Sequence, residues 1–292
     1  MKKVGSLVTM LFISILVFGQ DITNNTSYIH TNGFMNEANV EQRGNANFSD
    51  IKQEGSLSQA WVNQKGHENE ADVNQGWRRG NGWGQANAKG LFNGRGFQFK
   101  GDHISDITQV GNGNYAFQLQ LFRNNEAIVK QDGKGSKSYQ YQFGSDNYSS
   151  IEQESKEQTS TIVQMGNGNT HGSFQTGNQG VAKTTQFGSY NDAFTEQHGK
   201  MNNADVYQFG NGNKVIAKQK GQEHYGSILQ TGWLNDAKVR QHGSMQQSFV
   251  FQNGFGNIAN VRQHGGGSGE DHGGGHEDGD VQKGGGCGGG DH

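Results

Sequence analysis

Small, β-branched and glutamine side chains alternate with polar or charged ones along most of this chain. The segments Ala204-Asp-Val-Tyr-Gln208 and Val215-Ile-Ala-Lys-Gln219 show the pattern, and in each a glycine follows two residues after the glutamine. Alternation with a period of two is typical of a β-strand that buries one face. Glycine and asparagine, which follow many of these segments, favour tight turns. The pattern predicts strands of about five residues, each followed by a turn.

The glutamine returns every eleven residues, from Gln42 to Gln75 and again from Gln109 to Gln263. Two strands and two turns per 22 residues predict an all-β solenoid in which two parallel sheets face each other. Residues 31–264 then hold roughly ten or eleven rungs, stacked about 4.8 Å apart. The stretch 76–97 matches the repeat poorly, which indicates one or two irregular rungs or a surface loop.

Turns of the form Gly-x-x-Asn mark the longer period. The clearest ones are 22 residues apart, and the turns between them are looser. The predicted turn glycines are Gly144, Gly166, Gly188, Gly210, Gly232 and Gly254.

The repeated glutamine lies on the same side of each strand as the small and β-branched residues. If that side were exposed, Asp205, Lys218 and Arg240 would be buried instead, and burying charges costs far more than burying amides. We therefore expect the amides inside, each bonded to the amides of the rungs above and below, as in cross-β structures. A slip of one residue would break these bonds, so the ladders also fix the register. The predicted ladder residues are Gln42, Gln53, Gln64, Gln109, Gln142, Gln153, Gln164, Gln175, Gln186, Gln197, Gln208, Gln219, Gln230, Gln241, Gln252 and Gln263, with Asn147, Asn169, Asn191, Asn213, Asn235 and Asn257 in the turns.

Composition agrees with a repeat protein. Only 30% of the 292 residues are hydrophobic, which excludes a single thick core, whereas 10% aromatic residues and no proline argue against disorder. Residues 20–264 carry 21 basic and 21 acidic side chains, so the body is neutral and will not repel copies of itself. We expect no basic stripe for nucleic acid and no cofactor.

The start of the chain has the features of an export signal. In residues 1–19, Lys2 and Lys3 precede an apolar run that ends in small residues, which predicts a signal peptide. The run is too short for a membrane anchor, and no later stretch is apolar enough to span a bilayer. Residues 20–30 form an N-terminal segment before the solenoid.

Residues 265–292 form a glycine-rich tail with histidine and acidic residues, which we expect to be flexible. The tail suggests two chemistries. Cys287, the single cysteine, is either a free thiol or part of an intermolecular bond. The weak metal-ligand candidates are His272, His276, Asp278 and Asp280, whose spacing matches no known site. The alternative is a solvated tail that binds no metal.

Residues 136–153, SKSYQYQFGSDNYSSIEQ, fit the pattern Ser-x5-Gln-x-Gly-x-x-Asn-x-Ala-x3-Gln of the curlin repeat, with Ser149 in place of Ala. Except for the leading Ser, the same frame fits residues 180–197, 202–219, 224–241 and 246–263. The chain therefore resembles the curlin family over residues 31–264.

The resemblance implies a secreted structural subunit of curli, the extracellular functional amyloid fibres of bacterial biofilm matrices, which serve in adhesion. It also implies passage through the periplasm and a dedicated outer-membrane pore, and assembly with copies of itself on a nucleating minor subunit. The additional rungs, the stretch 76–97 and the tail depart from the usual family member. They leave open whether this chain is the major subunit or the nucleator.

The outward residues of the two sheets differ, because one sheet carries an apolar stripe and the other is mostly charged. An apolar stripe of this extent indicates a contact surface, such as one for lateral bundling of fibres. The alternative is that the aromatic side chains only stabilise their own sheet through cross-strand pairs. The predicted lateral surface is Tyr141, Phe143, Met165, Phe187, Tyr207, Phe209 and Phe251.

Other classes of function fit less well. No acidic pair, Ser/His/Asp set or Cys/His set stands apart from the repeat, so we expect no enzyme. The parallel β-helix polysaccharide lyases have three sheets and bulky aliphatic cores, which this chain lacks. A solenoid that binds ice or glycans as a surface adhesin needs a regular threonine array, and outward threonine is scattered here.

Overall fold

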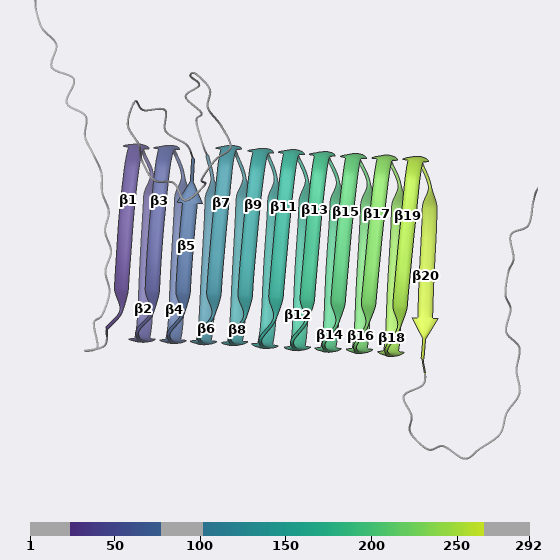
Figure 1. The fold of residues 1–292 in the computed structure, drawn as a ribbon. Helices are drawn as coiled ribbons and strands as arrows, with labels where there is room; N and C mark the ends of the chain where they lie inside the picture. Colours follow the sequence, from purple (N-terminus) through teal and green to yellow (C-terminus); the bar gives the residue numbers. More distant parts are fainter. Residues whose placement is uncertain (1–23, 77–101, 266–292) are drawn as a thin grey trace, which may run out of the picture.

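The computed structural model describes residues 24–76 and 102–265, which form a β-solenoid (Figure 1). Twenty strands divide into two parallel ten-stranded sheets, and the chain changes sheet at every strand. The predicted all-β solenoid with two facing parallel sheets is confirmed, and it has ten rungs. We call the two layers the odd sheet and the even sheet, after the numbers of their strands.

The first strand begins within the segment 20–30 that we expected to precede the solenoid. The odd sheet contains β1 (Thr26–Phe34), β3 (Phe48–Ser56), β5 (Glu70–Gln75), β7 (Tyr115–Arg123), β9 (Lys137–Ser145), β11 (Thr159–Asn167), β13 (Val181–Ser189), β15 (Asn203–Asn211), β17 (Tyr225–Trp233) and β19 (Gln247–Phe255). The even sheet contains β2 (Glu37–Asn45), β4 (Gln59–His67), β6 (Ile104–Asn112), β8 (Glu126–Lys134), β10 (Tyr148–Lys156), β12 (Thr170–Asn178), β14 (Asp192–Lys200), β16 (Lys214–Gln222), β18 (Asp236–Ser244) and β20 (Ile258–His264).

Each sheet stacks equal positions of the repeat directly on one another. Gln164 lies beside Gln186, and Gly166 lies beside Gly188, in adjacent strands of the odd sheet. A shift of one residue would turn every buried side chain outward, so the alternation of the sequence selects this register.

The irregular stretch does not add a rung. Strand β4 pairs directly with β6, and β5 pairs directly with β7, across the break in the repeat. The interpretation of 76–97 as irregular rungs is therefore wrong, and the extra residues lie between two strands of one rung. Residues 77–101 themselves lie outside the described part of the chain.

The strands are longer than predicted, because most span nine residues and not five. The glycine after the ladder glutamine does not end the strand: Gly166 has a φ of 123° and stays paired with Gly188. A Cβ on Gly166 would come 1.9 Å from the carbonyl oxygen of Gly188, so close stacking requires glycine here. The chain turns two residues later, in the left-handed region, at Gly168 or its counterpart Tyr190.

The same bend recurs on both arcs of each rung, but it varies more among the glycines of the second arc, where the sequence pattern is looser, than among the six predicted turn glycines of the first. On the second arc φ runs from 99° at Gly177 to 147° at Gly133, and Ser155 replaces one glycine. The first arc shows φ values between 109° and 123° at Gly144, Gly166, Gly188, Gly210, Gly232 and Gly254.

The core is a thin layer between the sheets, as the low apolar content requires. Alanine, valine and isoleucine fill it together with the glutamines. Its largest fully buried apolar side chains are Ile51, Ile107, Ile151, Ile162 and Ile228.

Candidate functional site: amide ladders and open solenoid ends

Two unbroken columns of glutamine amides run through the interior, one on each sheet. In every step the Nε2 atom of one glutamine donates to the Oε1 atom of the glutamine in the next rung, at 2.7–3.1 Å. On the odd sheet the column runs through Gln53, Gln75, Gln120, Gln142, Gln164, Gln186, Gln208, Gln230 and Gln252. On the even sheet it runs through Gln42, Gln64, Gln109, Gln131, Gln153, Gln175, Gln197, Gln219, Gln241 and Gln263.

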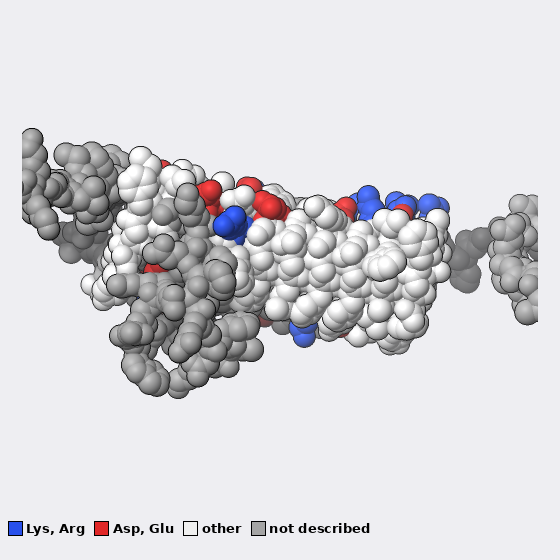
Figure 2. Space-filling view, turned by 90° about the horizontal axis from the view of Figure 1, so that it is seen from above, with Lys and Arg blue, Asp and Glu red and all other residues white. Residues whose placement is uncertain are grey.

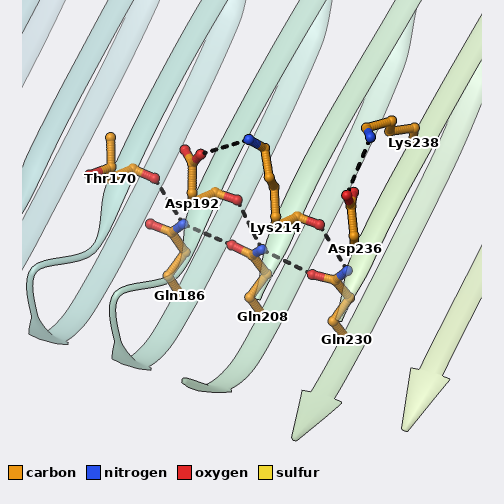
Figure 3. Close-up of polar contacts among 8 residues, drawn as sticks. All are labelled: Thr170, Gln186, Asp192, Gln208, Lys214, Gln230, Asp236 and Lys238. Carbon is orange, nitrogen blue, oxygen red and sulfur yellow. Dashed lines mark hydrogen bonds and ion pairs between the residues drawn. The ribbon is translucent and has the colours of Figure 1, made fainter. Parts of the chain in front are cut away.

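Each ladder amide also ties the two sheets together, which the sequence did not reveal. Figure 3 shows Gln208 donating along the ladder to Gln230 and across the core to the backbone carbonyl of Asp192, at 3.0 and 3.1 Å. Gln186 and Gln230 make the same cross-sheet bond to Thr170 and Lys214. Both amide hydrogens are thereby used, so the desolvation cost of the buried amide is met.

The ladders have a direction, because every donor points toward the C-terminal end of the solenoid. At that end, Gln252 and Gln263 have no further described rung to receive their ladder hydrogen. At the other end, Gln42 Oε1 accepts no bond from a described residue, and the buried Gln53 Oε1 has no partner because Thr31 occupies its column. One end therefore offers the donors of Gln252 and Gln263, and the other offers the acceptor of Gln42, whereas Gln53 lies one rung inside.

Asparagine forms a second type of column in the arcs. The backbone N–H of Asn169 donates to Asn147 Oδ1 at 3.1 Å, and Asn147 Nδ2 donates to the carbonyl of Gly166 at 2.9 Å. The amide thus holds the glycine bend of the next rung. The same contacts continue through Asn191, Asn213, Asn235 and Asn257.

Two further polar columns escaped the sequence reasoning. The opposite arc has its own asparagine column at Asn47, Asn69 and Asn114, and Gln118 donates to Gln140 beside the odd-sheet ladder at 2.9 Å. The available signal was the Gly-x-x-Asn pattern, which recurs at Gly44–Asn47 and 22 residues later at Gly66–Asn69.

Three histidines interrupt the buried columns. His103 and His224 stand at asparagine positions, and His171 stands where its strand neighbours have Ser149 and Ala193. Burial lowers the pKa of His171 to about 3 and that of His103 to about 4. Both imidazoles are therefore neutral at physiological pH.

The predicted lateral surface lies on the outward face of the odd sheet. Tyr207, Phe209 and Phe251 are exposed by 36%, 37% and 70%. The other members, which their neighbours half cover, are Tyr141, Phe143, Met165 and Phe187. Rings of adjacent rungs pair along the sheet, and Phe187 stacks on Phe209 with centroids 5.4 Å apart.

Exposed apolar side chains also gather on an arc, which the sequence reasoning missed. A shallow groove there is lined by Tyr190, Trp233, Leu234 and Phe255. Phe251 and Phe255 belong to the last strand of the odd sheet, so part of their exposure reflects the open end.

Several expected features concern other parts of the chain. The metal-ligand candidates His272, His276, Asp278 and Asp280, as well as Cys287 and the signal peptide, lie outside the described residues. Within residues 24–76 and 102–265 no group of three or more His, Cys, Asp and Glu could hold a metal ion. The same residues include no helix that is long and apolar enough to cross a membrane.

Residues 123–154 and 188–221 match the family model of the curlin associated repeat. These segments include strands whose ladders and arcs are the same as those of the remaining rungs. These two segments thus carry curlin repeats, and the resemblance drawn from the sequence is confirmed over them. No curated protein matches the chain. The repeat and the solenoid support, in general terms, a structural subunit of curli-like amyloid and not a catalyst.

Removing one ladder amide should cost more stability than removing any exposed one. In the Gln164→Leu variant, Gln142 Nε2 loses its acceptor and Gln186 Oε1 loses its donor, both of them buried. We expect a loss of about 2–4 kcal/mol in the free energy of unfolding, measured by guanidinium titration. The control Gln222→Leu, at an exposed position, should change it by less than about 0.5 kcal/mol. Equal effects would contradict a bonded interior ladder.

The free energy of unfolding should fall as the pH drops below about 6.5. In this range His171 and His103 are protonated in the unfolded chain but stay neutral in the folded protein, because burial lowers their pKa values. At pH 5 each buried histidine should cost about 2 kcal/mol relative to pH 8. Burial raises the pKa of Asp72 to about 6, so this carboxyl lowers the free energy of unfolding as the pH rises. Because this effect opposes that of the histidines, the comparison must isolate one histidine.

Guanidinium midpoints of wild type and His171→Ala between pH 8 and pH 5 provide that comparison. The variant should lose about half of the histidine-dependent slope, whereas Ser149→Ala, in the same column, should retain all of it. An unchanged slope in His171→Ala would show that this imidazole is protonated in the folded state.

Proposed function

We propose that this protein is a secreted structural subunit of curli-like extracellular amyloid fibres that grow by end-to-end stacking of solenoids. The observation that carries the proposal is the direction of the amide ladders, which leaves unlike and complementary ends. Biofilm matrix formation and cell adhesion are the roles that the curlin resemblance adds.

Both ends of the solenoid expose strand edges that can pair with another chain. Among the described residues, strands β1 and β2 pair on one side only, as do β19 and β20, and unpaired edges template further strands. If β20 of one copy pairs with β2 of the next, Gln263 can donate to Gln42 and continue the even-sheet ladder. On the odd sheet, Gln252 would meet the Thr31 hydroxyl. The joint would therefore repeat an internal step of the ladder on the even sheet, whereas on the odd sheet a hydroxyl would take the place of the amide.

The other partners of the proposal come from the family resemblance. They are a nucleating minor subunit and a dedicated outer-membrane secretion apparatus, reached from the periplasm after a signal peptide is removed. The chain itself is assigned no catalytic activity, cofactor or nucleic-acid partner. Its function is that of a polymer.

The outward face of the odd sheet is proposed as the surface through which fibres associate laterally. Its aromatic side chains form a stripe along the fibre axis, because successive rungs place them in register. Burying this stripe against another fibre would remove apolar area from water, whereas the charged even sheet would remain exposed.

A variant with carboxylates in the last rung should slow fibre growth. Gln252→Glu with Gln263→Glu retains acceptors for Gln230 and Gln241 but removes the donors that face an incoming subunit. The variant is diluted from denaturant onto preformed wild-type seeds, and thioflavin fluorescence measures the elongation rate. We expect this rate to be about tenfold or more below that of wild type. In small amounts the variant should also cap the fibre end that exposes β19 and β20.

The double variant Gln59→Glu with Gln222→Glu carries the same charge change on outward positions and serves as the control. It should elongate at the wild-type rate. The proposal fails if the end-rung variant elongates equally well, or if the wild-type chain remains a monomer after dilution and with seeds.

Replacing the outward aromatic residues should separate bundles and leave single fibres intact. We expect the variant with Tyr141, Phe143, Phe187, Tyr207 and Phe209 changed to threonine, a good strand former, to polymerise normally. Negative-stain micrographs should then show isolated fibres where wild type shows bundles. Unchanged bundling would show that the aromatic pairs only stabilise their own sheet and do not hold fibres together.

A further inference from the structure

The even sheet carries a concentrated positive patch near its C-terminal end, although the body of the chain is neutral. Figure 2 shows Lys and Arg gathered toward that end of the solenoid. We define the cationic patch as Lys218, Lys220, Arg240, His242, Arg262 and His264, which line a shallow surface groove.

Strand register concentrates these charges. Lys218, Arg240 and Arg262 stack in one column of adjacent rungs, and Lys220 begins the parallel column that continues with His242. Like charges directly opposite each other in a sheet are destabilising, with strands only about 4.8 Å apart. Anionic groups that bind to the patch would therefore relieve this repulsion.

The sheet itself supplies few carboxylates to the cationic patch. Lys218 Nζ is 2.5 Å from Glu196 Oε2, whereas Lys220, Arg240 and Arg262 make no ion pair with any described carboxylate. The three unpaired side chains are also exposed.

We propose that the acidic tail of the same chain, residues 266–292, lies on the cationic patch. The tail follows directly after β20, the strand that carries Arg262. It contains six acidic residues and one lysine, and five of the acidic residues fall between Glu270 and Asp280. Charge and connectivity therefore select this occupant.

The reach of the chain agrees with this assignment. Glu270 is five residues beyond Gly265 and can extend about 17 Å from it, whereas the patch spans about 10 Å across β16, β18 and β20. Tethering also gives the tail a local concentration in the millimolar range, which a free polyanion must exceed to compete. Since the patch lies on the outer face of the sheet, a tail bound there leaves the edge of β20 open for the next subunit.

Zero-length carbodiimide coupling of the full mature chain, followed by peptide mass spectrometry, tests this contact. Tail carboxylates should couple to the amines of Lys218 and Lys220, and not to Lys65 and Lys130 farther along the same sheet. The yield at Lys218 should drop about tenfold when Lys220, Arg240 and Arg262 are changed to Glu. Mixing with isotope-labelled chain should show that the links are intramolecular.

Coupling spread evenly over the lysines of all rungs, or coupling only between different chains, would overturn the proposal. The substituted side chains point outward, and an unchanged far-ultraviolet circular dichroism spectrum confirms that the variant folds. The neutral variant with Gln at the same three positions should give an intermediate yield.

Retention on immobilised heparin distinguishes the tail from an external polyanion as the occupant. Deleting residues 266–292 should uncover the patch and raise the salt concentration needed for elution. In the background with Lys220, Arg240 and Arg262 changed to Glu, the same deletion should have a much smaller effect. Equal shifts in both backgrounds, or equal retention with and without the tail, would show that the tail does not cover the patch.

Discussion

The solenoid depends on a buried amide that is fully hydrogen bonded. A chain with 30% hydrophobic residues cannot fill a thick core, so glutamine occupies a large part of the interior. Inside the core each amide needs partners, because an unpaired one would cost several kcal/mol. Stacking identical residues supplies one partner above and one below, and the facing sheet supplies a backbone carbonyl. The repeat is thus a direct consequence of using amides as core residues.

The same bonds give the solenoid a direction, and direction is what links fold to function. A glutamine that donates toward one end leaves a donor there and an acceptor at the other end, however many rungs are present. A second copy could continue the even-sheet ladder at either end, and no described residues cap either one. The glycine and asparagine columns reinforce the same register, because Asn147 bonds the bend at Gly166 in the next rung.

Much of this architecture could be predicted from sequence, because each ladder residue recurs with a fixed spacing. The interior position of Gln208 followed from its parity with Val206, whereas Gly166, predicted as a turn glycine, lies in β11 two residues before the turn. Strand length was not predictable, since a glycine with a φ of 123° can either end a strand or continue it. The cross-sheet bond to Asp192 was equally hidden, because it depends on the distance between the sheets. The cationic patch was missed for another reason: net charge averages over the chain, whereas the patch depends on which rungs are neighbours.

Hydrogen–deuterium exchange of glutamine side chains tests the central claim most directly. In fibres labelled with ¹⁵N-glutamine, solid-state NMR can follow the Nε2 hydrogens of ladder residues such as Gln164 beside those of outward residues such as Gln222. The account predicts that the ladder amides remain protonated long after the outward ones have exchanged. Equally fast exchange at both positions would mean that water reaches the amides, which would contradict a buried ladder.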